Sequence, residues 1–284
     1  MSIPITASKN YCSLEEKTVF QRIRIEIDAI GIAHVQLIRT EKRNALDYLG
    51  FTELAEAAAQ LRDNSRVRAV VMSGEGAAFC AGIDITLFAD PTDVHSLLQA
   101  PLDESGANAA QRVAWAWHML PVPVIAAVHG IAFGAGLQLM SAADIRYVHP
   151  DTKLSIMEIE YGLVPDMAGT QLWKTLVRAD VVRELTYTAR NFNGIEAQTL
   201  GFATQVTDDP LAMAMQTARA IAGKNPHAIR AAKRIFNAQA ADSVADGLRR
   251  EGSEQLALLF SPNQREAVAA KLQKRAPQFI DPTE

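Results

Sequence analysis

The chain has 284 residues, of which 49% are hydrophobic and 21% charged, so it carries enough apolar material for a folded core. This composition excludes a largely disordered chain, which would be short of apolar residues. The 28 basic and 32 acidic residues give a formal net charge of -4, which argues against general nucleic-acid binding because that needs a basic surface. The two cysteines, Cys12 and Cys80, are too few for a disulfide framework, and a reducing compartment is the simplest expectation.

Nothing in the sequence resembles a targeting or membrane segment. The first 20 residues include polar and charged side chains and lack the apolar core of a signal peptide. The longest apolar stretch, residues 122–140, is interrupted by His129, Gln138 and several glycines and prolines, so it is not expected to span a membrane. We therefore expect a cytoplasmic protein with neither a membrane nor a nucleic-acid partner.

In chain order, the pattern predicts short strands that alternate with helices. Alternating apolar and β-branched residues predict strands at 20–27, 32–38, 68–73, 122–129, 145–148 and 153–156. Residues rich in Ala, Leu, Glu and Gln predict helices at 49–62, from the glycine turn 134–136 to 143, at 170–177 and at 181–188. Residues 86–120, which contain two prolines and a polar run, read as a mobile loop.

The composition changes after about residue 205. From there the chain is rich in Ala, Arg and Lys and helical in pattern, with breaks at Asn225-Pro226 and Ser261-Pro262. We therefore predict a mixed strand-and-helix core with an N-terminal extension over residues 1–205, followed by a helical C-terminal region over 206–284.

Several common catalytic motifs are missing from the sequence. There is no G-x-S-x-G elbow, no H-E-x-x-H pair, no EF-hand loop and no P-loop. The glycine pairs at 74–76 and 134–136 lack the third glycine of a dinucleotide fingerprint. These absences disfavour a serine hydrolase, a nicotinamide enzyme and a nucleotide triphosphatase, and they predict no metal site.

Two glycine-bearing segments follow buried strands, at residues 79–85 and 126–136. Each places small residues beside exposed backbone, where free N–H groups can hold a negative oxygen. From the residues alone, two interpretations remain open: an anion-stabilising site, or tight turns with no further role.

A third segment, residues 158–166, carries three carboxylates in a largely apolar stretch. Carboxyl groups in such surroundings have raised pKa values, which suits acid/base chemistry. Glu160 is expected on a solvated face, and Asp166 could equally cap the helix predicted at 170–177. Glu158 follows a strand and has no obvious structural partner, so it is the strongest catalytic candidate.

Together, in this order and spacing, these segments resemble the crotonase (enoyl-CoA hydratase/isomerase) superfamily from about Arg22 to Phe279. The matching segments are Lys42-Arg43-Asn44-Ala45-Leu46, Phe79 to Asp84, Pro123 to Gly130, Gly134 to Leu139, Ala143 to Arg146, Gly162 to Pro165, Gly169-Thr170 and Lys274 to Phe279. The resemblance implies an α/β fold, a ClpP/crotonase-like spiral of ββα units with an α-helical C-terminal region. It also implies a homotrimer or a dimer of trimers, with residues 206–284 as the trimerisation region.

The resemblance further implies an acyl-CoA substrate, with coenzyme A as part of the substrate and no tightly bound cofactor. By position, the backbone N–H groups of Ile83 and Ala135 would form an oxyanion hole for a thioester enolate. Ala81 and Asp84 would contact the adenine and ribose end of coenzyme A. Lys274, from the same or a neighbouring subunit, would meet its 3′-phosphate; an ordinary exposed helix lysine is the alternative.

The same resemblance assigns the catalytic groups. Hydratases of the family use two glutamates; the second matches Glu158, but the first falls on Gln138, which cannot exchange a proton at neutral pH. Asp166 falls where the family's dienoyl-CoA isomerases carry a second catalytic aspartate. We therefore favour double-bond isomerisation of enoyl- or dienoyl-CoA by Glu158 and Asp166. The alternatives are hydration of 2-enoyl-CoA, with Gln138 holding the water, and a non-catalytic acyl-CoA binding subunit.

Overall fold

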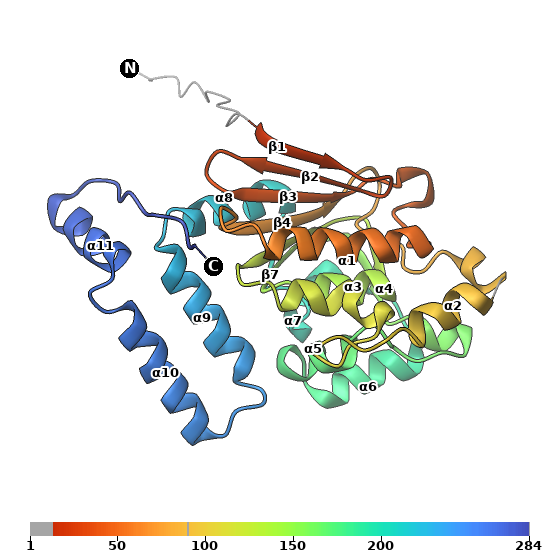
Figure 1. Cartoon of the computed structure of the whole chain (residues 1–284). Helices are drawn as coiled ribbons and strands as arrows, with labels where there is room; N and C mark the ends of the chain where they lie inside the picture. Colours follow the sequence, from red (N-terminus) through yellow and green to blue (C-terminus); the bar gives the residue numbers. More distant parts are fainter. Residues whose placement is uncertain (1–13, 90, 284) are drawn as a thin grey trace, which may run out of the picture.

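A computed structural model describes residues 14–89 and 91–283 (Figure 1). Cys12 and most of the N-terminal segment that argued against a signal peptide lie outside these residues, whereas Cys80 is a buried free thiol. Within the described ranges, no helix combines the length and the apolar character that a membrane crossing requires.

A seven-stranded mixed sheet forms the centre of the molecule. Its strands in spatial order are β1 (Leu14–Val19), β2 (Ile23–Asp28), β3 (Ile32–Leu37), β4 (Ala69–Gly74), β5 (Val124–Val128), β7 (Ile145–Val148) and β10 (Gln205–Val206). The first three strands pair antiparallel, and the pairs from β3 to β10 are parallel. Every residue of β4 and β5 is buried, as expected for parallel strands that are covered on both faces.

Helices cover the two faces of this sheet. One face carries α1 (Tyr48–Arg62), α3 (Ala109–His118) and α4 (Ala135–Ser141) in the main apolar core. The other face meets α8 (Pro210–Ala222), whose Ala214, Ala218 and Ala222 pack on Val71 and Ile125. Small alanine side chains let this helix approach the sheet closely.

A second, three-stranded sheet follows directly from the first. It consists of β6 (Ile131–Phe133), β8 (Lys153–Ser155) and β9 (Phe192–Asn193). Isolated bridges pair Cys80 with Ala132 and Leu46 with Ile83, so the segment after β4 runs alongside β6. This contact brings the two glycine-bearing segments to one place. The remaining elements around it are η1 (Thr40–Lys42), η2 (Ile85–Ala89), α2 (Pro91–Leu98), η3 (Glu158–Tyr161), α5 (Gly169–Leu176), α6 (Ala179–Thr188) and α7 (Gly194–Leu200).

The C-terminal helices α9 (Pro226–Ala238), α10 (Val244–Leu258) and α11 (Pro262–Gln273) stand apart from the sheet body as an arm (Figure 1). Buried polar contacts attach the arm to the core. Lys233 Nζ lies 2.8 Å from Asp144 Oδ2 and donates to the Val122 carbonyl, and Arg68 pairs with Asp281 at 2.7 Å. Helix α10 contributes no buried residue, and its Val244, Leu248 and Leu256 side chains are exposed.

The mixed α/β fold with a helical C-terminal region is confirmed, but residues 86–120 are not the predicted loop. They contain η2, α2 and α3. Helix α3 begins with a capping box, in which Asn108 Oδ1 accepts from the Gln111 N–H while Gln111 Oε1 accepts from the Asn108 N–H. The two prolines and Gly106 belong to helix ends and to the link between the helices.

Candidate active site

The first part of the site is the turn that carries Ile83. Gly82 adopts a left-handed φ of +99°, and its carbonyl accepts from the Leu46 N–H at 2.8 Å. The Asp84 N–H donates back to the Leu46 carbonyl, also at 2.8 Å. These bonds hold the turn from both sides, and among the described residues no hydrogen-bond acceptor lies opposite the Ile83 N–H.

The second part is the turn that opens α4. Gly134 has a φ of +47°, and its N–H donates to the Ser155 carbonyl at 3.0 Å. The next N–H, that of Ala135, has no acceptor in the described parts of the chain. A Cβ added to Gly82 would lie 2.9 Å from the Phe133 carbonyl oxygen and 3.9 Å from the Ala135 nitrogen. The two turns therefore touch, and the two free N–H groups belong to one site.

Glu158 is placed directly beside these turns. A Cβ added to Gly134 would lie 3.3 Å from Glu158 Oε1. Gln138 Nε2 donates to that oxygen at 2.6 Å, whereas Glu158 Oε2 is buried with no partner. Burial raises the pKa of Glu158 and the charge of Asp166 raises it further, against the hydrogen bond from Gln138, which lowers it. Glu158 therefore holds a proton more readily than an ordinary glutamate, which suits a group that must take a proton and return it.

Asp166 lies in an adjoining apolar hollow. Its neighbours there include Phe51, Leu87 and Leu97, and burial raises its pKa. Helix α5 begins after Ala168 without a side-chain cap, so the alternative role of Asp166 as a helix cap does not hold. Glu160, by contrast, is exposed, as expected for a solvated face.

The two hollows meet at shared walls. Ile83 and Phe88 line both the hollow that contains Glu158 and the hollow that contains Asp166. Ala81, Gly82 and Ala135 complete the wall near Glu158. The structure thus places both carboxylates and both backbone N–H groups around two adjoining hollows.

Asp84 and Lys274, both predicted to contact coenzyme A, lie in different surroundings. The Asp84 carboxylate lies 2.7 Å from Arg39 Nη2 and accepts from Thr86 Oγ1 at 2.8 Å. Burial opposes ionisation, but these bonds lower the pKa of Asp84, so its carboxylate serves to hold the turn. Lys274 is exposed at the end of α11, on the outlying arm and away from this chain's own site (Figure 1).

Two aromatic residues of the site escaped the sequence analysis. Phe88 and Tyr161 line the hollow beside Glu158, and their ring centroids lie 6.4 Å apart. Phe88 belongs to the segment interpreted as a loop. Tyr161 follows Glu160 within the carboxylate segment, and its exposed ring carried no pattern that would have indicated a site.

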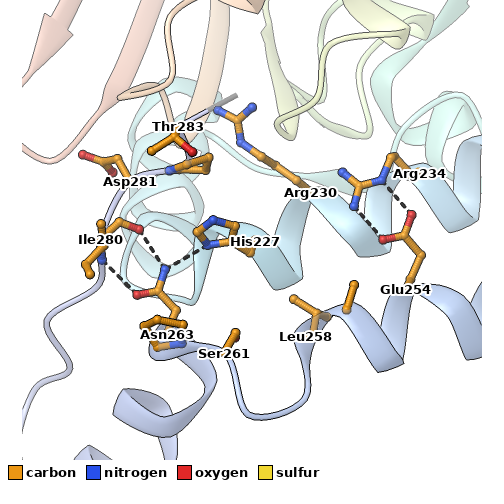
Figure 2. A pocket seen from close by; sticks show the side chains of 13 residues that line it. His227, Arg230, Arg234, Glu254, Leu258, Ser261, Asn263, Ile280, Asp281 and Thr283 are labelled. Atoms are coloured by element: carbon orange, nitrogen blue, oxygen red, sulfur yellow. Dashed lines mark hydrogen bonds and ion pairs between the residues drawn. The ribbon is translucent and has the colours of Figure 1, made fainter.

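A further hollow lies between the helices of the arm (Figure 2). It has a volume of about 400 Å³, and most of its polar groups bond to one another. Arg234 and Glu254 form two bonds of 2.6 and 2.7 Å. Asn263 joins His227 to the Ile280 backbone. The hollow contains no pair of raised-pKa carboxylates, so we place the chemistry at Glu158.

A buried proton-accepting carboxylate beside two fixed backbone N–H donors defines a class of protein: an enzyme that stabilises an oxyanion while moving a proton. The chain belongs to the enoyl-CoA hydratase/isomerase family, whose sequence profile matches residues 28–282. The chain is therefore an enzyme of this family, and the candidate site lies within the matched residues.

Similar proteins support this assignment at the level of the whole chain. A peroxisomal Delta(3,5)-Delta(2,4)-dienoyl-CoA isomerase of Arabidopsis thaliana is 31% identical, covering 94% of this chain and 99% of the relative. A mitochondrial enzyme of the same name from Mus musculus is 34% identical, covering 92% of this chain and 82% of the relative. The crystal structure of an enoyl-CoA hydratase from Mycobacterium smegmatis superposes with a TM-score of 0.81 at 27% identity, covering 90% and 98% of the two chains. The predicted crotonase-type fold is thereby confirmed.

Proposed function

We propose that this enzyme moves the double bonds of an unsaturated acyl-CoA, converting a 3,5-dienoyl thioester into the 2,4-dienoyl isomer. The observation that carries the proposal is a second, partly buried carboxylate, Asp166, in the hollow next to Glu158, together with a glutamine at position 138. The names of the Arabidopsis and mouse relatives support the same reaction.

The proposed proton transfers balance. Glu158, beside the oxyanion turns, takes a proton from C2 and leaves a dienolate whose charge spreads over the oxygen, C2, C4 and C6. The N–H groups of Ile83 and Ala135 stabilise the oxygen, and one such donor is worth about 3–4 kcal/mol in a well-studied hydrolase. Asp166, further along the acyl chain, gives a proton to C6. Proton exchange between the two carboxyl groups, direct or through solvent, then restores the starting state.

Hydration of 2-enoyl-CoA, a lyase reaction, is the second candidate. The similarity to a solved enoyl-CoA hydratase favours it. In that reaction Glu158 would activate a water held by Gln138, but the two side chains are already in direct contact at 2.6 Å. This contact leaves no room for a water between them, so we rank hydration second.

A substrate panel tests the proposal. Purified enzyme is given 2-enoyl-, 3-enoyl- and 3,5-dienoyl-CoA of several chain lengths, and the conjugated thioester absorbance is followed. We expect kcat/KM for the 3,5-dienoyl substrates to exceed that for hydration of crotonyl-CoA at least 100-fold. Faster hydration than isomerisation would favour the second candidate instead.

The proposal extends to assembly and ligand binding. We propose a cytoplasmic homotrimer or dimer of trimers, without a tightly bound cofactor because carboxylates and backbone amides supply the chemistry. Ala81 and the Asp84 backbone would contact the adenine and ribose of coenzyme A, and Lys274 of a neighbouring subunit would contact its 3′-phosphate.

Outward-facing apolar side chains of the arm support association; they are Val244, Leu248, Leu256, Phe260 and Leu272. Sedimentation tests this assembly, since Leu256→Glu should shift it towards the monomer, and a monomeric wild type would contradict it.

A further inference from the structure

The side chain of Gln138 connects the two parts of the site that hold the carboxylates. Its Oε1 accepts from the backbone N–H groups of Met167 and Gly169, both at 2.9 Å. Its Nε2 donates to Glu158 Oε1 at 2.6 Å. One buried amide therefore bonds to the turn that follows Asp166 and to Glu158 itself.

These contacts determine the orientation of the amide. Turning it over would place its NH2 group against two backbone N–H donors and its oxygen against a carboxylate oxygen, so every contact would become repulsive. Gly169 allows the close approach, because a Cβ there would lie only 2.7 Å from Gln138 Oε1. Gln138 is therefore held as an acceptor on one side and a donor on the other.

The consequence for Glu158 is an asymmetry between its two oxygens. Oε1 accepts from Gln138 whether or not the carboxyl group is protonated, so it cannot carry a proton without losing this bond. Oε2 is buried without a partner. We propose that Gln138 is a positioning residue that keeps Glu158 Oε1 as a permanent acceptor, so that Oε2 alone takes and returns the substrate proton. This inference rests on the proposed isomerisation for its catalytic meaning.

The charged groups around Glu158 are few. Asp166 is the neighbour whose charge acts on it. Helix α6, which packs against η3, carries Asp180, Arg183 and Glu184, and all three are exposed. The Cys80 thiol behind α4 is neutral at working pH, because burial raises its pKa to about 12. Gln138 and Asp166 are therefore the two polar side chains that tune Glu158.

Substitutions at position 138 test the proposal, with Ser141 as a matched control. Gln138→Leu removes the donor. Gln138→Glu keeps an acceptor for the Met167 and Gly169 N–H groups but places a carboxylate against Glu158. This variant carries the test if Gln138→Leu fails to fold. Ser141 lies on the same helix and ties it to α5 through a bond from Trp173 Nε1 to Ser141 Oγ at 2.9 Å, without touching Glu158.

The decisive readout is the pH dependence. Loss of a hydrogen bond to a charged group shifts a carboxyl titration by about one to two pH units. We expect the acid limb of kcat for dienoyl isomerisation to move up by this amount in both position-138 variants and to stay in place in Ser141→Ala. A position-138 variant that folds, loses activity and keeps the wild-type acid limb would show a merely structural role and overturn the proposal.

A second readout is independent of activity. The infrared carboxyl band that Glu158→Gln abolishes reports the titration of Glu158 directly. We expect this band to titrate at higher pH in Gln138→Leu than in the wild type, and an unchanged titration would overturn the inference. If the wild type titrates as expected but does not isomerise dienoyl-CoA, the proposed function fails while the positioning role of Gln138 stands.

Discussion

Replacing Glu158 with glutamine isolates the catalytic proton from the shape of the site. The two side chains have nearly the same volume, and the carbonyl oxygen of the new amide can still accept the 2.6 Å bond from Gln138. What disappears is the group that takes the proton. Removing a general base typically lowers the rate 10²–10⁴-fold, or about 3–5 kcal/mol in activation free energy.

The same substitution should leave stability equal or higher at neutral pH. Burial first, and the charge of Asp166 second, raise the pKa of Glu158 above its ordinary value of 4.5. A carboxyl group whose folded pKa lies above its unfolded pKa binds more protons in the folded state. The contribution of Glu158 to the free energy of unfolding is thus fully present below about pH 4.5, and it is lost as the pH rises through the folded pKa. Glutamine has no charge to bury, so this loss should vanish.

Three measurements on the same preparation check this reasoning. Isomerisation should fall at least 100-fold, binding of a CoA thioester should stay within a few-fold of wild type, and Tm should decline less between pH 5 and 8. Near-normal turnover in a folded Glu158→Gln protein would refute the assignment of Glu158 as the base. A Tm that falls with pH as steeply as in the wild type would refute the account of its burial.

Three further substitutions, the last with a matched control, probe the other parts of the structure. Asp166→Asn should lower 3,5-dienoyl isomerisation 10²–10⁴-fold while sparing any 3-enoyl to 2-enoyl isomerisation, as a two-substrate assay would show; an equal loss on both substrates would contradict its role at C6. Gly82→Ala should strain the turn at φ +99° and press a methyl group to 2.9 Å from the Phe133 carbonyl, lowering kcat more than substrate affinity; unchanged kinetics would contradict this. Lys233→Met should destabilise the protein by about 3 kcal/mol in urea unfolding, because the Asp144 carboxylate loses its charged partner, whereas Arg178→Ala, at a fully exposed ion pair, should leave the urea midpoint unchanged.

Most strands of the seven-stranded sheet could be predicted from the sequence, because they show the alternating apolar and β-branched residues that are typical of strands. The β5 segment was predicted at 122–129 and lies at Val124–Val128, where every residue is buried. Helices α2 and α3 were missed because prolines and Gly106 stand near their ends. The capping bonds between Asn108 and Gln111 become visible only when the helix forms.

The residues of the candidate site were easier to predict from the sequence than the side-chain contacts around them, and their catalytic roles stay predictions. Glu158, Asp166, Ile83 and Ala135 could be named from motif positions, and the structure brings them together around adjoining hollows. That Gln138 bonds to Met167 and Gly169 could not be predicted, because these contacts join residues about 30 positions apart. The role of Asp84 was also hidden, since Arg39 reaches it from a segment 45 positions earlier in the chain.

Position 138 decides how many negative charges the site must hold. A glutamate there would place a third carboxylate beside Glu158 and Asp166, both of which already have pKa values raised by burial. Like charges at such short range raise each other's pKa, so fewer of the three groups would be ionised at neutral pH. Glutamine removes that charge and supplies a donor instead, which lowers the pKa of Glu158 against the effect of burial. The glutamine thus favours the ionised form of Glu158, which is the form that can take a proton inside an apolar hollow.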